Sequence, residues 1–392
     1  MKTKSAGIIA EYNPFHNGHL YHVEETRRLS GADVVMAAMS GNFLQRGAMA
    51  VADKWLRAEI AVMCGADLVV EIPTVFACAS AKIFAEAGVE ILENLGADHI
   101  SFGSESGNIE ELSAISRVIK DNMREIQEHI DRRIKEGISY PRARREAVCA
   151  IIGDDMAGAI DSPNNILAIE YLNAIKRAKP MTVKRSGPGY NEKTVSDGLA
   201  SATAIRDMMA KGQDISQLLP GKSYEALLRT GIPSEEKFFD MIRQKVLMTE
   251  GWLLDNAPAG GEGLGNKLKN SIRLCSDREQ LAEMLKSKRY TRTRIDRFLA
   301  QTVLGIDRRE HSANYIRVLA FNDKGRKYLK EIKKSDICSL PLITNINKEA
   351  AGYPQIFYSL SRDILAADLY NIASGRDLYL FSEYVRKPFC TD

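Results

Sequence analysis

The sequence Ala6-Gly7-Ile8-Ile9-Ala10-Glu11-Tyr12-Asn13-Pro14-Phe15-His16-Asn17-Gly18-His19 decides the fold. Its apolar start is typical of a buried strand, and residues 18–29 have the spacing of a helix. A glycine at such a turn lets a ligand approach the backbone, and the N–H groups and dipole of the helix start favour an anion. The imidazoles of His16 and His19 can donate hydrogen bonds to phosphate oxygens, more strongly when charged. We therefore predict a triphosphate site at this turn.

The same order of strand and helix repeats through the first hundred residues. The apolar patterns predict strands at residues 5–12, 33–39, 67–72 and 98–102, and helices at residues 18–29, 53–64 and 79–95. A further short strand is a candidate at residues 181–184. Strands that alternate with helices of this length indicate an α/β fold with a doubly wound parallel sheet, covered on both faces. Ligands bind beyond the carboxyl ends of such strands, so the turns at 13–19, 40–47, 73–80 and 103–107 are the candidate ligand positions.

The pattern changes after Pro220-Gly221, where strand alternation fades. Helical spacing then dominates, at residues 235–249, 264–277, 278–288 and 292–304. A chain of 392 residues is long enough for two domains. We predict a nucleotide-binding catalytic domain at residues 1–220 and a mainly helical domain at residues 221–392.

Composition excludes several classes of protein. No apolar run reaches the roughly 18 residues that span a bilayer, and Met1-Lys2-Thr3-Lys4 is not followed by the separate apolar core of a signal peptide. We therefore expect a cytoplasmic protein without a membrane segment. The six cysteines are scattered without a C-x-x-C pair, which argues against a zinc or redox motif and for reduced thiols. Because the net charge is only +3, nucleic-acid binding requires a local basic patch.

A second candidate phosphate clamp is Ser201-Ala202-Thr203-Ala204-Ile205-Arg206, at the start of a predicted helix. The Arg206 guanidinium can hold phosphate oxygens through two hydrogen bonds, and the hydroxyls of Ser201 and Thr203 can donate to them. Taken alone, the stretch also fits an ordinary N-capped helix. The two histidines have alternatives as surface residues or zinc ligands. No acidic or cysteine partner stands near them at a useful spacing, so we predict no protein metal site.

A basic cluster spans residues 286–297, with six basic side chains, one acid and one aromatic residue. Neutralising several phosphates gives salt-sensitive RNA binding, and a tyrosine can stack on an unpaired base. The candidate RNA contacts are Lys286, Lys288, Arg289, Tyr290, Arg292, Arg294 and Arg297. A solvated helix face carries similar runs of charge, and that alternative stays open.

The histidine motif, joined to the Ser201–Arg206 signature, resembles the nucleotidyltransferase superfamily that carries an H-x-G-H motif. More narrowly, five stretches resemble the tRNA(Met) cytidine acetate ligase family. They are Gly7 to His19, Met39-Ser40-Gly41-Asn42-Phe43-Leu44-Gln45-Arg46-Gly47, Ser162-Pro163-Asn164-Asn165-Ile166-Leu167, Ala200 to Arg206 and Arg289-Tyr290-Thr291-Arg292-Thr293-Arg294-Ile295. The stretches are spread over nearly the whole chain, so the resemblance is not confined to one domain.

The resemblance implies an ATP-dependent ligase that works in two steps. Acetate attacks ATP to give acetyl-adenylate and pyrophosphate. The acetyl group then passes to the exocyclic amine of the wobble cytidine of elongator tRNA(Met), giving N4-acetylcytidine. Mg²⁺ is expected to share in binding the phosphates, and no protein partner is predicted.

The resemblance also implies roles for individual residues. The catalytic residues would be His16, His19 and Arg206. The ATP contacts would be Gly7, Ile8, Ile9, Ala10, Glu11, Tyr12, Asn13, Pro14, Phe15, His16, Asn17, Gly18, His19, Leu20, Gly103, Asn164, Asn165, Arg185, Ser201 and Thr203. The turn after the second strand, with Ser40, Gly41, Asn42, Gln45 and Arg46, could line the pocket for acetate or contact the target base, and a purely structural loop is the open alternative. For Asn164 and Asn165, helix capping is an equally good interpretation.

Two other functions remain open. An enzyme of the same superfamily that adenylylates a small molecule in cofactor synthesis would share His16 and His19, but it would leave the basic cluster unexplained. A non-catalytic RNA-binding protein could hold ATP only as a ligand. Composition does not choose acetate over another small carboxylate, and only the resemblance does.

Overall fold

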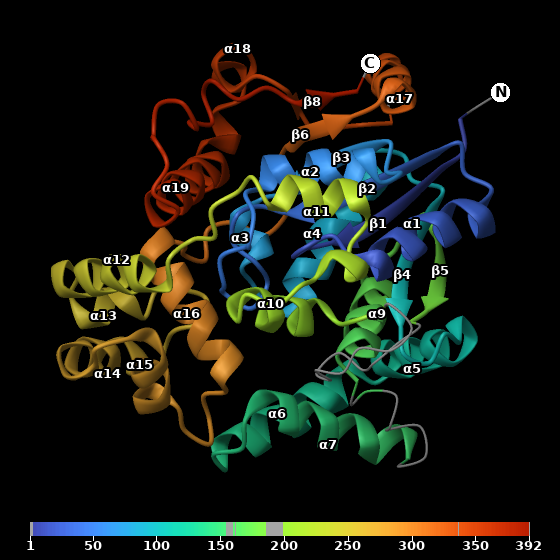
Figure 1. Cartoon of the computed structure of the whole chain (residues 1–392). Helices are drawn as coiled ribbons and strands as arrows, with labels where there is room; N and C mark the ends of the chain where they lie inside the picture. Colours follow the sequence, from blue (N-terminus) through green and yellow to red (C-terminus); the bar gives the residue numbers. More distant parts are fainter. Residues whose placement is uncertain (1–2, 154–159, 161, 186–198, 336, 392) are drawn as a thin grey trace.

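The computed structural model describes residues 3–153, 160, 162–185, 199–335 and 337–391, and its centre is one twisted sheet (Figure 1). Five strands pair in parallel in the order β5-β4-β1-β2-β3. They are β1 (Ser5–Ala10), β2 (Val34–Ser40), β3 (Leu68–Ile72), β4 (His99–Ser104) and β5 (Lys179–Lys184). The predicted doubly wound parallel sheet is therefore confirmed. The strand order reverses between β1 and β4, which is the point where such sheets bind ligands.

Successive residues of β1 point to opposite faces of the sheet, as a pleated strand requires. Ile8 packs with α1 (Asn17–Ser30), α2 (Lys54–Met63), α10 (Ala202–Ala210) and α11 (Gly221–Leu227). Ile9 packs on the other face, with α4 (Ala81–Asn94) and α9 (Pro163–Ala174). Because both faces are covered there, the central strands β1, β2 and β3 are mostly apolar and almost completely buried.

The charged segment after β4 forms three helices below the sheet edge (Figure 1). These are α5 (Ile109–Asp121), α6 (Met123–Lys135) and α7 (Tyr140–Ile152). Each buries one narrow apolar stripe, as Ile126 and Ile130 do in α6, while its charged face meets solvent. A short helix, α3 (Thr74–Ala77), follows β3 directly.

The second part of the chain begins as a group of helices beside the sheet (Figure 1). The group contains α12 (Glu235–Met248), α13 (Gly251–Leu254), α14 (Leu264–Ser271), α15 (Arg278–Leu285) and α16 (Arg292–Leu304). The bounds of α16 agree with the predicted helix. The predicted helix at 264–277 is shorter, because α14 ends at Ser271 and a 3-10 turn, Ile272–Leu274, follows.

The chain then returns to the sheet, which the sequence pattern did not predict. Strand β6 (Ile316–Phe321) pairs antiparallel with β3, and β7 (Leu342–Ile343) and β8 (Phe389–Cys390) pair with β6. Helices α17 (Asp323–Lys334), α18 (Ile346–Glu349) and α19 (Phe357–Ala373) surround these strands. The second part is mainly helical, but it completes the sheet of the first. The division at residue 220 therefore stays a prediction.

In the described part of the chain, no helix combines the length and the apolar character needed to cross a membrane.

Candidate active site

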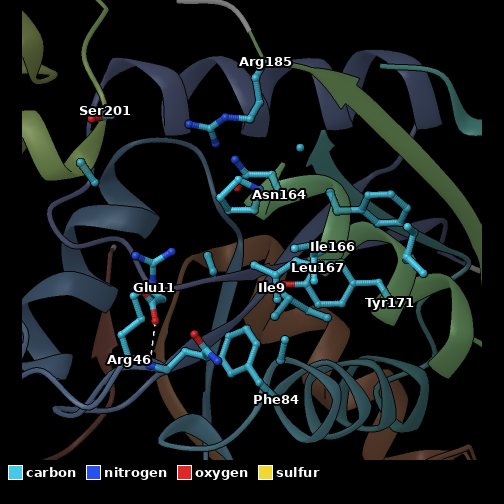
Figure 2. A pocket seen from close by; sticks show the side chains of 18 of the residues that line it. Ile9, Glu11, Arg46, Phe84, Asn164, Ile166, Leu167, Tyr171, Arg185 and Ser201 are labelled. Carbon is cyan, nitrogen blue, oxygen red and sulfur yellow. Dashed lines mark hydrogen bonds between the residues drawn. The ribbon is translucent and has the colours of Figure 1, made fainter. Parts of the chain in front are cut away.

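A cavity of about 620 Å³ opens beyond the carboxyl ends of β1 and β4, where the strand order reverses. Figure 2 shows Arg185, Asn164 and Ser201 on one side of it, Glu11 and Arg46 on another, and an apolar wall that includes Ile9, Phe84, Leu167 and Tyr171. Residues far apart in the sequence meet here because the sheet gathers all its carboxyl ends at one edge.

The two histidines of the motif form a stacked pair at the start of α1. Their ring centroids lie 3.8 Å apart. The Nδ1 atom of His16 accepts the N–H of Gly18 at 3.0 Å, and Nδ1 of His19 accepts the N–H of His16 at 3.3 Å. Since an acceptor Nδ1 carries no proton, the proton of each neutral ring is on Nε2. The capping box thus leaves the proton of each neutral imidazole on Nε2, and the His19 ring also hydrogen-bonds the backbone of Pro14.

The environment of the pair opposes positive charge on it. Burial, and after it the guanidinium groups of Arg185 and Arg206, lower the pKa of His16 to about 3. Burial and the neighbouring His16 also hold the pKa of His19 well below its ordinary value. The sequence suggested imidazoles that bind phosphate more strongly when charged. The structure places neutral donors next to two permanent cations, an arrangement that can hold a polyanion without first protonating a histidine.

Arg206 joins the second signature to the first. Its Nη1 donates to the backbone oxygen of Asn13 at 2.8 Å, and its Nη2 donates to the Thr203 hydroxyl at 3.1 Å. Ser201 caps α10 by accepting the N–H of Ala204 at 3.1 Å, which confirms the predicted cap. Arg206 and Ser201 line the cavity, whereas Thr203 lies outside the lining and holds Arg206 in place.

Asn164 and Asn165 lie on different sides of the start of α9. Asn164 lines the cavity and donates to Glu105 Oε1 at 2.6 Å. Asn165 is buried, and its Oδ1 accepts the N–H of Glu105 at 3.0 Å. The N–H of Asn165 in turn donates to Glu105 Oε2 at 2.9 Å. Because the Asn165 side chain is buried and its oxygen is already bonded, these contacts favour a structural role, and the expected ATP contact stays a prediction. Gly103 and Arg185 line the cavity as expected.

Some residues of the stretch from Gly7 to Leu20 line the cavity, and the others pack behind them. Ile8, Ile9, Ala10, Glu11, Tyr12, Asn13, His16, Gly18 and His19 line the cavity. Gly7, Pro14, Phe15, Asn17 and Leu20 fall outside the lining. Gly7 lets Leu92 approach, since a Cβ at Gly7 would lie 2.7 Å from that side chain. Asn17 donates to the backbone oxygen of Gln217 at 2.9 Å.

The stretch from Ser40 to Arg46 divides in the same way. Gln45 and Arg46 line the cavity, and Ser40, Gly41 and Asn42 do not. Asn42 is buried and accepts the N–H of Lys54 at 2.7 Å. A Cβ at Gly41 would lie 2.4 Å from Glu71 Oε1. These three residues pack the turn against α2 and β3, so their expected place in a substrate pocket is corrected.

A model of the family described as HIGH Nucleotidyl Transferase matches residues 3–379. The chain is 37% identical over 362 residues to the tRNA(Met) cytidine acetate ligase of Clostridium novyi (strain NT), covering 87% of this chain and 90% of that protein. It is also 37% identical to the protein of that name from Clostridium acetobutylicum, covering 97% and 98%. The chain belongs to the HIGH nucleotidyl transferase family, among its tRNA(Met) cytidine acetate ligases.

Solved structures of this family have the same fold. Thermotoga maritima TmcAL in its apo form I superposes with a TM-score of 0.89 at 29% identity, and 99% of each chain is covered. A second Thermotoga maritima TmcAL structure, described as bound with alpha-thio ATP, has the same TM-score, identity and coverage.

Several side chains of the basic cluster are already paired with acidic residues of the protein. Arg292 pairs with Glu279 and Asp296, and Arg289 pairs with Glu262 at 3.1 Å. Tyr290 is only 8% exposed, its hydroxyl donates to Glu262, and the Arg294 guanidinium lies 4.8 Å from its ring centroid. Because its ring is buried, we correct the expected stacking of Tyr290 on a base.

The remaining members of the cluster face two directions. Lys286 and Lys288 are exposed and Arg289 is partly exposed, although Lys286 pairs with Glu283 at 3.1 Å. Arg294 turns inward and donates to the backbone oxygens of Ala259 and Gly260. Arg297 lines the cavity, together with Thr291 and Thr293. The cluster thus connects a basic surface to the cavity.

Sequence reasoning missed several residues at the site. His22 lines the cavity, its Nε2 lies 3.0 Å from the Ser101 hydroxyl, and burial lowers its pKa to about 4. Its spacing of three from His19 on the same helix face was a signal that could have found it. Arg144 and Arg145 of α7, which the sequence offers only as part of a second basic stretch for RNA, also line the cavity. Among the described residues, no group of three or more His, Cys, Asp and Glu side chains could hold a metal ion.

Proposed function

We propose that the protein is an ATP-dependent tRNA(Met) cytidine acetate ligase of the cytoplasm. It would activate acetate as acetyl-adenylate, release pyrophosphate, and acetylate the exocyclic amine of the wobble cytidine of elongator tRNA(Met). The observation that supports this most is the stacked His16–His19 pair facing Arg206 and Arg185 in one cavity, in a chain of this family. The structure of Thermotoga maritima TmcAL bound with alpha-thio ATP supports ATP as the nucleotide.

The first step brings a carboxylate to a triphosphate, so the site must neutralise charge. The two Nε2–H donors and the start of α1 would bind the phosphates and the charge that develops at the α-phosphate. Arg206 would hold the leaving pyrophosphate, and Thr203 and Asn13 fix its guanidinium for that task. Mg²⁺ would enter with ATP, held by phosphate oxygens and water more than by protein carboxylates.

The rest of the nucleotide would lie across the strand ends. Gly103 and Asn164 would contact adenosine from the β4–β5 side, and Arg185 would contact the nucleotide close to its phosphates. This placement leaves the side with Glu11 and Arg46 for acetate and the target base (Figure 2), and Gln45 lies there too, because its N–H bonds Glu11.

We propose that residues 221–392 help to seat the tRNA while residues 1–220 carry out the chemistry. Lys286, Lys288 and Arg289 form a basic surface just before α16, and Thr291, Thr293 and Arg297 reach the cavity. Phosphates of an anticodon loop bound at the first group would place its unpaired bases near the second. The affinity for tRNA should fall as the salt concentration rises, because binding releases counterions from the phosphates.

The test combines two assays on the same protein. Wild type should exchange labelled pyrophosphate into ATP only with acetate present, and mass spectrometry of digested tRNA should find labelled N4-acetylcytidine. His16→Ala should lose both activities and still bind tRNA. His311→Ala, at an exposed histidine, should lose neither.

Two results would replace the proposal. Adenylyl transfer to a phosphorylated small molecule, without acetate dependence, would identify an enzyme of cofactor synthesis. Binding of ATP and tRNA by the wild type without any modification of the RNA would identify a non-catalytic RNA-binding protein.

A further inference from the structure

Among the described residues that line the cavity, Glu11 is the carboxylate, and it shares the cavity with several cations and with the histidine pair. Glu11 lies directly after β1 and lines the cavity, together with His16, His19, Arg185 and Arg206. A carboxylate next to a triphosphate is repulsive, and it would weaken ATP binding if it faced the phosphates. Glu11 therefore suits a different ligand, one that offers hydrogen-bond donors.

The position of Glu11 is fixed by both its backbone and its side chain. The buried Arg57 donates to the backbone oxygen of Glu11 at 2.5 Å, and it also bonds the backbone oxygen of Gly41 at the end of β2. The N–H of Gln45 donates to Glu11 Oε1 at 2.9 Å. The protein thus fixes the carboxylate through Oε1, so that Oε2 can serve a ligand.

The neighbour of Glu11 in the cavity is a cation. Figure 2 shows the side chains of Glu11 and Arg46 together on one side, apart from Arg185 and Asn164. Arg297 of α16 lines the cavity too, and it lies close enough to Arg46 for the two positive charges to interact. This side of the cavity therefore presents a hydrogen-bond acceptor and donors next to one another, close to the helix that connects to the basic surface.

Such a pattern matches one edge of cytosine. The base offers its exocyclic N4–H₂ as a donor and its N3 and O2 as adjacent acceptors, and carboxylates accept from N4 in known protein–nucleic acid contacts. Uracil would bring its O4 acceptor against the carboxylate and leave it without a donor, which disfavours that base.

We propose that Glu11 accepts the N4–H of the target cytosine and takes up the proton released on acetylation, while Arg46 donates to the N3 and O2 edge. This inference rests on the proposed function and assigns residues to its second step. Glu11 would then be a catalytic residue of acetyl transfer, and not one of the ATP contacts that the resemblance implied.

The chemistry explains why a base is needed. The N4 lone pair is delocalised into the ring, so the amine is a poor nucleophile until a proton leaves. N4 attacks the carbonyl carbon of acetyl-adenylate and forms the C–N bond. The bond between the acyl carbon and the phosphate oxygen breaks, AMP leaves with the electron pair, and the N4 proton passes to Glu11 Oε2.

The test separates the two steps with Glu11→Gln, which keeps an oxygen for the Gln45 N–H but cannot accept a proton. We expect acetate-dependent pyrophosphate exchange within about twofold of wild type. We also expect single-turnover transfer from preformed acetyl-adenylate to tRNA to fall by roughly 100-fold or more. Arg46→Gln should weaken transfer and spare exchange. Glu24→Gln, at an exposed residue of α1, is the matched control and should change neither rate.

The other outcomes are each decisive. Equal loss of exchange and transfer in Glu11→Gln would place Glu11 in the first step or in the fold, and it would overturn the inference. Normal transfer in that variant would overturn it as well. Failure of the proposed function has a different signature, because the wild type itself would then show no acetate-dependent exchange or no N4-acetylcytidine.

Discussion

The histidine pair shows how local hydrogen bonds set the chemistry of a residue. His16 caps α1, and His19 receives the N–H of His16, so the backbone occupies both Nδ1 atoms. Protonating either Nδ1 would break a cap and place a cation beside Arg185 and Arg206. The pair therefore works as neutral donors, and folding favours the unprotonated rings.

This preference makes stability depend on pH. The pKa of His16 is about 3 in the folded chain and about 6.5 when unfolded, so the unfolded state binds more protons between these values and stability falls as the pH falls through that window. Between pH 7.5 and 5.5, wild type should lose about 1 kcal/mol more of its unfolding free energy than His16→Asn. Asparagine keeps a capping side chain but does not titrate. Urea unfolding at both pH values measures the difference, and equal losses would contradict the low pKa.

The turn between β2 and α2 illustrates how one element positions another. Gly47 has φ +80°, and a Cβ there would lie 2.4 Å from the backbone oxygen of Asp296 in α16. The turn that carries Gln45 and Arg46 therefore packs directly against α16, the helix that carries Arg297. This contact joins the two parts of the chain at the cavity.

Gly47 and Gly137 have similar positive φ angles, so comparing them separates backbone strain from the contact with α16. Gly137 has φ +84° and nothing within 4 Å of an added Cβ. Gly137→Ala should lose about 1 to 2 kcal/mol, the cost of the left-handed conformation. Gly47→Ala should lose about 1 to 3 kcal/mol more, because backbone must also move. Urea unfolding compares them, and equal losses would show that the turn is not seated on α16.

At the scale of the whole molecule, a buried ionic network holds the two parts together. Lys54 of α2 is fully buried and pairs with Glu71 of β3 at 2.7 Å and with Glu383, near the end of the chain, at 3.0 Å. Burial alone would lower the pKa of Lys54, but Glu383 and Glu71 hold it above its ordinary value. Trp55 adds a second link, since its Nε1 donates to Glu383 at 2.8 Å.

Removing the central cation should therefore destabilise both parts at once. Lys54→Met leaves the buried Glu71 without its cation and leaves Glu383 with Trp55 and with Arg317, whose Nη2 lies 3.9 Å away, and we expect a loss of about 3 to 5 kcal/mol. Lys82→Met removes an exposed lysine whose pair with Glu86 is 3.9 Å long, and it should have little effect. Chemical unfolding gives the two losses. Two separate transitions in wild type would argue against a network that unites the parts.

The sequence alone predicted four of the five parallel strands, with the fifth as a candidate, and it also predicted the helices around them and the turn that carries His16 and His19. These features depend on local apolar periodicity and on short-range caps, which neighbouring residues decide. It also pointed to Arg206, because a hydroxyl-rich helix start with an arginine is a local pattern.

Only the tertiary structure decided which residues of each motif face the cavity. Asn165 and Asn42 have the right chemistry, but both are buried and their side-chain oxygens accept backbone N–H groups, while the Thr203 hydroxyl accepts from Arg206. Strand β6 was missed because its pairing partner, β3, lies more than two hundred residues away in sequence. Tyr290 is buried and Arg297 lines the cavity because segments that are distant in the sequence pack together. A local sequence pattern does not predict such contacts.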